Sequence, residues 1–303
     1  MTSIKQQTLA GEFGFKGKGL HTGKTSNMVL RPAPTGTGIL FRRVDLGADA
    51  IVEALAENIS STARSTTISK GEVSVATIEH IMSALTGMGV DNAIIDIDNV
   101  EVPILDGSAR FYAEALAASG TAVQDAPRKY IDIPGVLEVK DEKTGSFVRL
   151  TPSEKPEIDV TIDFGSKVLG VQTARWDETV DYASAIAPCR TFVFFHEIAY
   201  LFQNNLVKGG DMDNAIVIAE HPVTEEQISE LSALFNVPKL EIKEGYLNNL
   251  KLRFPDECGR HKLLDLIGDL RLAGGYLNAN VTAFKPGHTI NSQLTKAVRE
   301  HTR

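Results

Sequence analysis

The order of strand-like and helix-like segments, which is the same in both halves of the chain, most constrains the fold. In the first half, short strand-like runs separated by Gly and Pro precede helical periodicity in residues 79–85 and 109–119. In the second half, strand-like runs between residues 130 and 164 precede helical runs at 224–235 and 259–273. Strands followed by helices are typical of α+β folds and differ from the alternating order of a doubly wound parallel sheet. The sequence therefore predicts an α+β fold.

A break between the two halves is expected near residue 125. The segment TAVQDAPRK (121–129) has no clear periodicity and contains charges and a Pro, which are typical of a domain boundary. We predict an N-terminal domain over residues 1–125 and a C-terminal domain over 126–303. A short echo between VDNAIIDI (90–97) and MDNAIVI (212–218) fits an internal duplication, but it equally fits two turn-then-strand segments of similar composition.

Charge and cysteine content narrow the class of protein. The chain has 31 Lys and Arg against 39 Asp and Glu, a formal net charge of −8, so we expect no nucleic-acid partner. Cys189 and Cys258 are the only cysteines, and the N-terminus lacks the apolar region of a secretory signal, which predicts a cytoplasmic protein with free thiols. No apolar run is long enough for a transmembrane helix. The chain ends soon after its last motif, so we also expect no fused second enzyme, and we expect a monomer.

The strongest chemical signal is HKLLD, followed by another Asp one turn later. His261, Asp265 and Asp269 are spaced by four residues and share one face of the predicted helix. His and Asp side chains one turn apart can bind the same metal ion. The alternative is an ordinary solvated face, because charged residues on helices are usually exposed. The opposite face is apolar, so we expect this helix to pack on a core and to present His261 and Asp265 away from it.

A second candidate is the TIEH segment at the start of the first predicted helix. Glu79 and His80 point about 100° apart on a helix, so one could bind a metal while the other acts as an acid or base. The alternative is a Glu favoured by the helix dipole and a His at the edge of the core.

Together these segments fit a catalytic zinc site. His80, His261 and Asp265 would supply three N and O ligands and leave a fourth position for water. Glu79 would then be placed as a general base. Because the ligands come from both halves, the site is expected at the domain interface.

Two further segments carry weaker signals. His288 follows a Pro-Gly turn, where it could act as a general acid oriented by Asp269, although a lone loop His is more often solvated. The aromatic run that begins at Phe192 is typical of a core but could instead line an acyl channel. The glycine-rich segment around His21 matches no nucleotide-binding motif and indicates a turn near a site.

Seven motifs, in order across nearly the whole chain, resemble the zinc-dependent UDP-3-O-acyl-N-acetylglucosamine deacetylases. They are GLHTG (19–23), TIEH (77–80), PILDGSA (103–109), CRTF (189–192), GGDMDNAIV (209–217), RHKLLDLIGDL (260–270) and TAFKPGH (282–288). The resemblance implies removal of acetate from the 2-amino group of UDP-3-O-(3-hydroxyacyl)-N-acetylglucosamine, the committed step of lipid A synthesis in Gram-negative bacteria. It also implies two similar α+β domains, each a β-α-α-β sandwich, with the active site between them.

The resemblance assigns a role to each matching residue. His80, His261 and Asp265 would bind one zinc ion, and Glu79 would be the general base. His288 would stabilise the oxyanion and protonate the leaving amine, with Asp269 orienting it. Thr191 would contact the tetrahedral intermediate, and residues 192–220 would form the acyl-chain passage. The substrate-binding residues implied are Lys262, Phe192, His21 and Gly210.

Two other functions remain open from the sequence. The first is a zinc amidohydrolase that acts on another N-acetyl sugar, which a lack of dependence on the acyl chain would favour. The second is a non-catalytic protein that keeps zinc for structure, which would need a closed set of four protein ligands.

Overall fold

The computed structural model describes residues 4–203, 206–238 and 240–301, and two β-sheets with the same strand order form its framework. In the first sheet, with order β2-β3-β9-β4-β5, the central strand β9 is antiparallel to β3 and parallel to β4. From Ser26 to Leu30, every second residue of β3 is buried, which is the alternation expected of a sheet with one face on the core. The strands are β2 (Phe13–Lys18), β3 (Thr25–Pro32), β4 (Ile39–Arg43), β5 (Ile51–Glu53) and β9 (Ala93–Ile97).

The second sheet repeats this plan with order β12-β13-β20-β14-β15. Its central strand β20 is antiparallel to β13 and parallel to β14, and β11 pairs with β20 off the main path. The counterpart of β9 is therefore β20, so the sequence echo, which paired β9 with β17 (Ile216–Ile218), matched the wrong strands. The strands are β11 (Tyr130–Asp132), β12 (Leu137–Lys140), β13 (Phe147–Pro152), β14 (Ile158–Asp163), β15 (Val171–Trp176) and β20 (Tyr276–Phe284).

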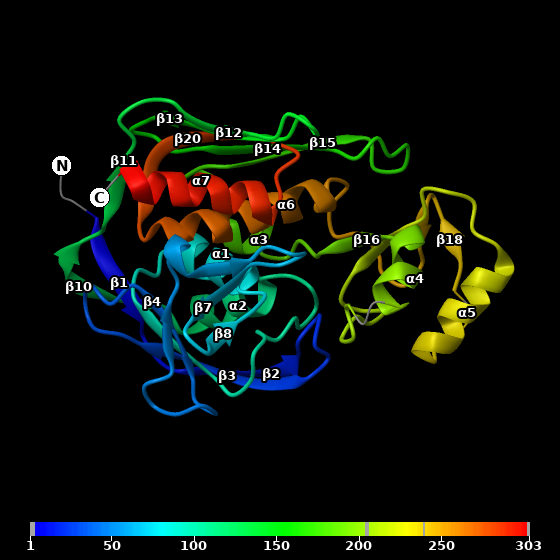
Figure 1. The fold of residues 1–303 in the computed structure, drawn as a ribbon, viewed down its shortest axis with the longest axis horizontal. Helices are drawn as coiled ribbons and strands as arrows, with labels where there is room; N and C mark the ends of the chain where they lie inside the picture. Colours follow the sequence, from blue (N-terminus) through cyan, green and yellow to red (C-terminus); the bar gives the residue numbers. More distant parts are fainter. Residues whose placement is uncertain (1–3, 204–205, 239, 302–303) are drawn as a thin grey trace.

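The main helices lie between the two sheets (Figure 1). Helices α1 and α6 cross so closely that a Cβ at Gly268 of α6 would collide with the backbone O of Glu79 in α1. The helices are α1 (Glu79–Gly87), α2 (Arg110–Ser119), α3 (Tyr182–Ala185), α6 (Glu257–Leu270) and α7 (His288–His301), with short 3₁₀ turns η1 (Ala56–Asn58) and η2 (Arg271–Ala273). One buried hydrophobic cluster runs through both halves. The predicted α+β sandwich is confirmed.

Each half carries an insertion, between β5 and α1 in the first half and between β15 and α6 in the second. The first insertion is a small sheet of β6 (Ile59–Ser61), β7 (Thr67–Lys70) and β8 (Val73–Val75). The second is larger and projects from the sandwich on the right of Figure 1, where it has its own small core. It contains β16 (Phe192–Phe194), α4 (Phe195–Gln203), β17, α5 (Glu225–Phe235), β18 (Ile242–Lys243) and β19 (Tyr246–Leu247). Thr224 and Gln227 form a capping box at the start of α5.

The expected linker at 121–129 is largely a strand. Residues Thr121–Pro127 form β10, which pairs antiparallel with β1 (Lys5–Leu9). Strand pairing with a distant segment satisfies its backbone groups even though its own sequence lacks a regular pattern. The division of the chain at residue 125 stays a prediction. Within the described residues, no helix is long and apolar enough to cross a membrane.

Candidate active site

Three predicted metal ligands meet where α1 crosses α6. His80 lies on α1, and His261 and Asp265 lie one turn apart on α6. One ligand atom from each residue lies within 4.8 Å of those of the other two, so the cluster could hold a metal ion. All three side chains are buried. The expectation that His261 and Asp265 face away from the core is wrong, because α1, α7 and the second sheet cover α6 on several sides.

The hydrogen bonds of the cluster leave the ligand atoms free for a cation. His261 Nδ1 lies 3.0 Å from the carbonyl O of Cys189, to which it can donate, so that Nε2 keeps a lone pair. Burial lowers the pKa of His261 to about 3, which keeps the ring neutral. Asp265 Oδ1 is buried, has no hydrogen-bond partner, and lies 3.6 Å from His80 Nε2 and 3.5 Å from His261 Nε2. Two imidazoles and an unpartnered carboxylate oxygen fit a divalent transition metal ion such as zinc.

Glu79, the residue before His80, is held beside this cluster. Its Oε2 accepts a hydrogen bond from the backbone N–H of Thr66 at 3.0 Å, and its Oε1 lies 3.7 Å from His288 Nε2. Burial raises the pKa of Glu79 above its ordinary value. A carboxylate with a raised pKa is suited to accept a proton near neutral pH.

His288 is fixed by a buried network that the sequence indicated only in part. It is the first residue of α7 and is buried, so the alternative of a solvated loop His is wrong. His288 Nδ1 lies 2.9 Å from Asp269 Oδ2. Asp269 also accepts hydrogen bonds from Thr66 Oγ1 at 2.6 Å and Asn291 Nδ2 at 2.8 Å. Burial disfavours the imidazolium, but Asp269 and Glu79 outweigh this and raise the pKa of His288 to about 9.

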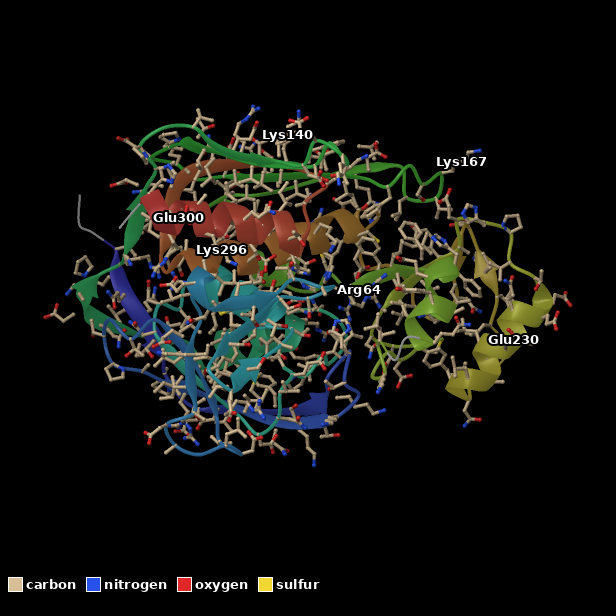
Figure 2. All side chains as sticks on the ribbon, in the orientation of Figure 1. Arg64, Lys140, Lys167, Glu230, Lys296 and Glu300 are labelled. Atoms are coloured by element: carbon tan, nitrogen blue, oxygen red, sulfur yellow. The ribbon has the colours of Figure 1, made fainter. Side chains whose placement is uncertain are left out.

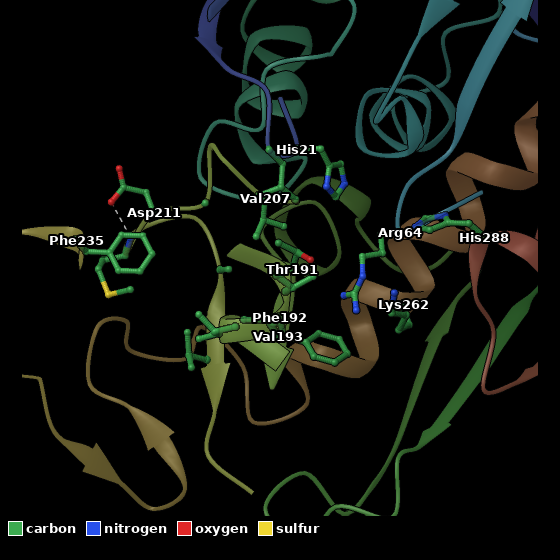
Figure 3. A pocket seen from close by; sticks show the side chains of 17 residues that line it. His21, Arg64, Thr191, Phe192, Val193, Val207, Asp211, Phe235, Lys262 and His288 are labelled. Atoms are coloured by element: carbon green, nitrogen blue, oxygen red, sulfur yellow. Dashed lines mark hydrogen bonds between the residues drawn. The ribbon is translucent and has the colours of Figure 1, made fainter. Parts of the chain in front are cut away.

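A cavity of about 250 Å³ extends from His288 into the projecting insertion (Figure 3). Its polar end is lined by His21, Arg64, Lys262 and His288. Lys262 Nζ lies 2.8 Å from Asp265 Oδ2 and 5.7 Å from the centre of the Phe192 ring. The apolar end is lined by Ile198, Leu201, Val207, Met212, Val217 and Phe235.

The apolar lining differs from the expected aromatic one. Among the side chains of the aromatic run that the structure describes, which exclude that of Phe202, only Phe192 contacts the cavity. Phe194 stacks on His196 instead, and Tyr200 is 58% exposed. The strand-to-helix change between β16 and α4 turns Ile198 and Leu201 towards the cavity. The aromatic residues of the sequence could not predict this apolar lining, because it depends on where α4 begins.

Thr191, His21 and Gly210 also line the cavity. Thr191 is positioned by its backbone N–H, which donates to Gly107 O at 2.8 Å. His21 lies on a turn whose backbone N–H groups donate to the buried carboxylate of Glu101. His21 Nε2 is buried without a hydrogen-bond partner. The structure thus brings all the predicted site residues to one region.

Sequence reasoning missed several residues of this region. Thr66, Asn291 and Glu101 are buried and hold the functional side chains, but isolated polar residues carry no local signal. Arg64 has a φ of 64° and projects from the first insertion towards the second, where its Nη2 lies 3.2 Å from Glu197 Oε1 (Figure 2). The unusual STARSTT composition around it could have marked a constrained turn.

Comparison with known proteins identifies the family. A family model described as UDP-3-O-acyl N-acetylglycosamine deacetylase matches residues 6–232 and 240–300. The chain belongs to this family. The resemblance seen in its motifs is thereby confirmed.

Relatives within the deacetylase family fall into two kinds. A bifunctional enzyme LpxC/FabZ of Porphyromonas gingivalis is 43% identical over 98% of this chain but 64% of its own length. A second bifunctional LpxC/FabZ, from Bacteroides thetaiotaomicron, is 39% identical over 99% of this chain and 65% of its own length. A UDP-3-O-acyl-N-acetylglucosamine deacetylase of Teredinibacter turnerae is 40% identical over 97% of this chain and 89% of its own length. The chain therefore spans less than two thirds of the bifunctional relatives.

Proposed function

We propose that this chain removes the N-acetyl group from UDP-3-O-(3-hydroxyacyl)-N-acetylglucosamine, giving acetate and the free 2-amine, as a step of lipid A biosynthesis. Membership of the deacetylase family supports the reaction. The observation that carries the proposal is the buried cluster of two His and one Asp beside Glu79 and His288. His288, together with Lys262, lines a cavity with one polar and one apolar end.

The proposed cofactor is one zinc ion held by His80, His261 and Asp265. When bound, zinc would polarise the amide carbonyl and acidify the attacking water. The unpartnered Oδ1 of Asp265 and the neutral ring of His261 support this ligand set. Three protein ligands leave the site open, which favours catalysis over a purely structural zinc site.

The remaining chemistry is assigned to three buried side chains. Glu79 takes a proton as water attacks the carbonyl carbon of the amide. His288 in its imidazolium form donates from Nε2 to the amine nitrogen as the C–N bond breaks. Asp269 holds the opposite ring nitrogen, and Thr66 and Asn291 fix that carboxylate. Thr191, at the edge of the cavity, would contact the tetrahedral intermediate.

The cavity suggests how the substrate is oriented. The sugar and its amide would lie at the polar end near Lys262, Phe192, His21 and Gly210, and the acyl chain would extend along the apolar lining. We also propose that the chain has a domain boundary near residue 125, is a monomer and is located in the cytoplasm. Buried, unbonded Cys189 and Cys258 agree with a reducing compartment.

The pH dependence tests the role of His288 and Asp269. With the pKa of His288 near 9, the imidazolium is lost as the pH rises through that value, so kcat/KM should fall there. Asp269→Asn removes the negative charge that favours the imidazolium, and the alkaline limb should move to lower pH by about one unit or more. Metal content should stay unchanged. If activity drops equally at all pH values, Asp269 is structural and the assignment fails.

Dependence on the acyl chain separates the proposed substrate from another N-acetyl sugar. Ala215 lines the cavity, so Ala215→Phe should obstruct its apolar end. We expect kcat/KM to fall at least ~10-fold for a long-chain substrate, since each buried CH₂ contributes about 0.8 kcal/mol, and to change little for a short-chain analogue. Ala233→Phe, on the exposed face of α5, is the control. Equal wild-type rates on both substrates would favour the alternative sugar.

A further inference from the structure

A second cavity, separate from the active site, lies at the other end of α6. It has a volume of about 230 Å³ and lies where the two halves of the chain meet. Its walls come from β1, the β3–β4 turn, the end of β5 with the residues after it, residues 91–92 before β9, the residue before β11, η2 with the glycine after it, and the end of α7. It includes three cationic residues, Lys129, Arg271 and Arg299. Figure 1 shows the C-terminal end of α7 beside β11, on the side of the sandwich away from the insertion.

Arg271 is a buried cation without a carboxylate partner. Arg271 is only 7% exposed, and its Nε has no hydrogen-bond partner. Its Nη2 makes only long contacts with the carbonyl O atoms of Val90, at 3.5 Å, and Asp91, at 3.3 Å. No ion pair of Arg271 occurs within the ranges that the structure describes. The guanidinium also lies over the Tyr276 ring, 4.6 Å from its centre, but a neutral ring supplies no counter-charge. Burying a charge without a counter-ion is costly, which points to a missing anionic partner.

Lys129 and Arg299 increase the positive charge near Arg271. A Cβ at Gly274 would lie 3.1 Å from Arg299 Nη1 and 3.9 Å from Lys129 Nζ, so the two cations approach each other around this glycine. Arg299 pairs with Glu57 at the surface. Lys129 Nζ has neither a hydrogen bond nor an ion pair among the described residues.

The carboxylates in the cavity wall do not balance these charges. Asp91 is already bound by Arg128 at 3.0 Å, and Glu53 is bound by Lys70 at 2.9 Å. Neither Arg128 nor Lys70 lines the cavity. Neither Arg271, which is buried, nor Lys129, which is exposed, therefore has a carboxylate partner among the described residues.

We propose that this cavity binds a phosphate-class oxyanion, either inorganic phosphate or the phosphoryl group of a small metabolite. Arg and Lys side chains are the usual protein partners of such groups. Arg271 directly follows α6, and Arg299 lies in the last turn of α7. A bound anion therefore links the C-terminal ends of α6 and α7. The same two helices carry His261, Asp265 and His288 of the active site.

The test measures thermal stability in inorganic phosphate against chloride at equal ionic strength. Wild-type protein is compared with Lys129→Ala, in the second cavity, with Lys262→Ala, in the active site, and with Lys243→Ala, on an exposed strand. We expect phosphate at about ten times its Kd to raise Tm by about 2 °C or more in the wild type, Lys262→Ala and Lys243→Ala. Lys129→Ala should lose at least half of this rise.

Three outcomes overturn the proposal. One is no rise in the wild type, and another is a rise lost only in Lys262→Ala, which would place binding at the active site. The third is an equal rise in all four proteins, which would reflect general exclusion of phosphate from protein surfaces. If inorganic phosphate raises Tm as expected, the same series with glycerol phosphate distinguishes a free phosphate site from one that prefers a phosphomonoester.

Discussion

Glu79→Gln should keep its metal and lose at least ~10² in kcat, the usual scale for loss of a general base. The amide has the size of the carboxyl and can still accept the hydrogen bond from the backbone N–H of Thr66, but it cannot take a proton from water. The loss corresponds to about 2.7 kcal/mol of transition-state stabilisation. Metal content by elemental analysis and acetate release by the same sample provide the two measurements.

Glu114→Gln is the matched control for this variant. Glu114 lies on the exposed side of α2 and pairs with Arg110, far from the cavity. Its substitution should leave both metal content and kcat unchanged. Full activity of Glu79→Gln would rule out Glu79 as the base, and loss of metal from that variant would reassign it to the ligand set.

His261→Ala should lose metal and activity together. The substitution removes one of three ligands and also the hydrogen bond from Nδ1 to Cys189 O that orients the ring. We expect metal content to fall well below that of the wild type and kcat/KM to fall by about 10³ or more, because metal assistance is worth several kcal/mol. The contrast with Glu79→Gln separates binding of the metal from transfer of the proton.

His301→Ala is the matched control for His261→Ala, because it also removes one imidazole side chain. His301 is exposed at the end of α7, and its ring contacts only the local backbone within the described residues. The control should retain metal and activity. If His261→Ala retains a full complement of metal and its activity, the proposed ligand set is wrong.

The sequence predicted the fold where local patterns suffice. The apolar run of residues 93–97 and the helical spacing of residues 79–85 correspond closely to β9 and α1. It failed at β10, whose pairing partner β1 is more than 100 residues away, and at the echo between residues 90–97 and 212–218. Strand order depends on long-range pairing, so β20, which was not part of the echo, occupies the position that matches β9.

The active site was likewise predictable only where local spacing brings residues together. His261 and Asp265 were predictable because one helix turn brings them together. The TIEH segment and the Pro-Gly turn made His80 and His288 weaker candidates, which the family resemblance strengthened. The burial of these residues was not predictable, since it depends on how α1, α7 and a sheet enclose α6. Thr66 and Asn291, which fix Asp269, come from distant segments and leave no mark in the sequence.

The most direct test of the account is acetate release from UDP-3-O-(3-hydroxyacyl)-N-acetylglucosamine by the purified protein, before chelation, after chelation and after zinc is returned. We expect release that the chelator abolishes and that one equivalent of zinc restores. The absence of release from folded, zinc-loaded protein across several acyl-chain lengths would contradict the proposed reaction. Release that chelation leaves unchanged would contradict the role of the metal.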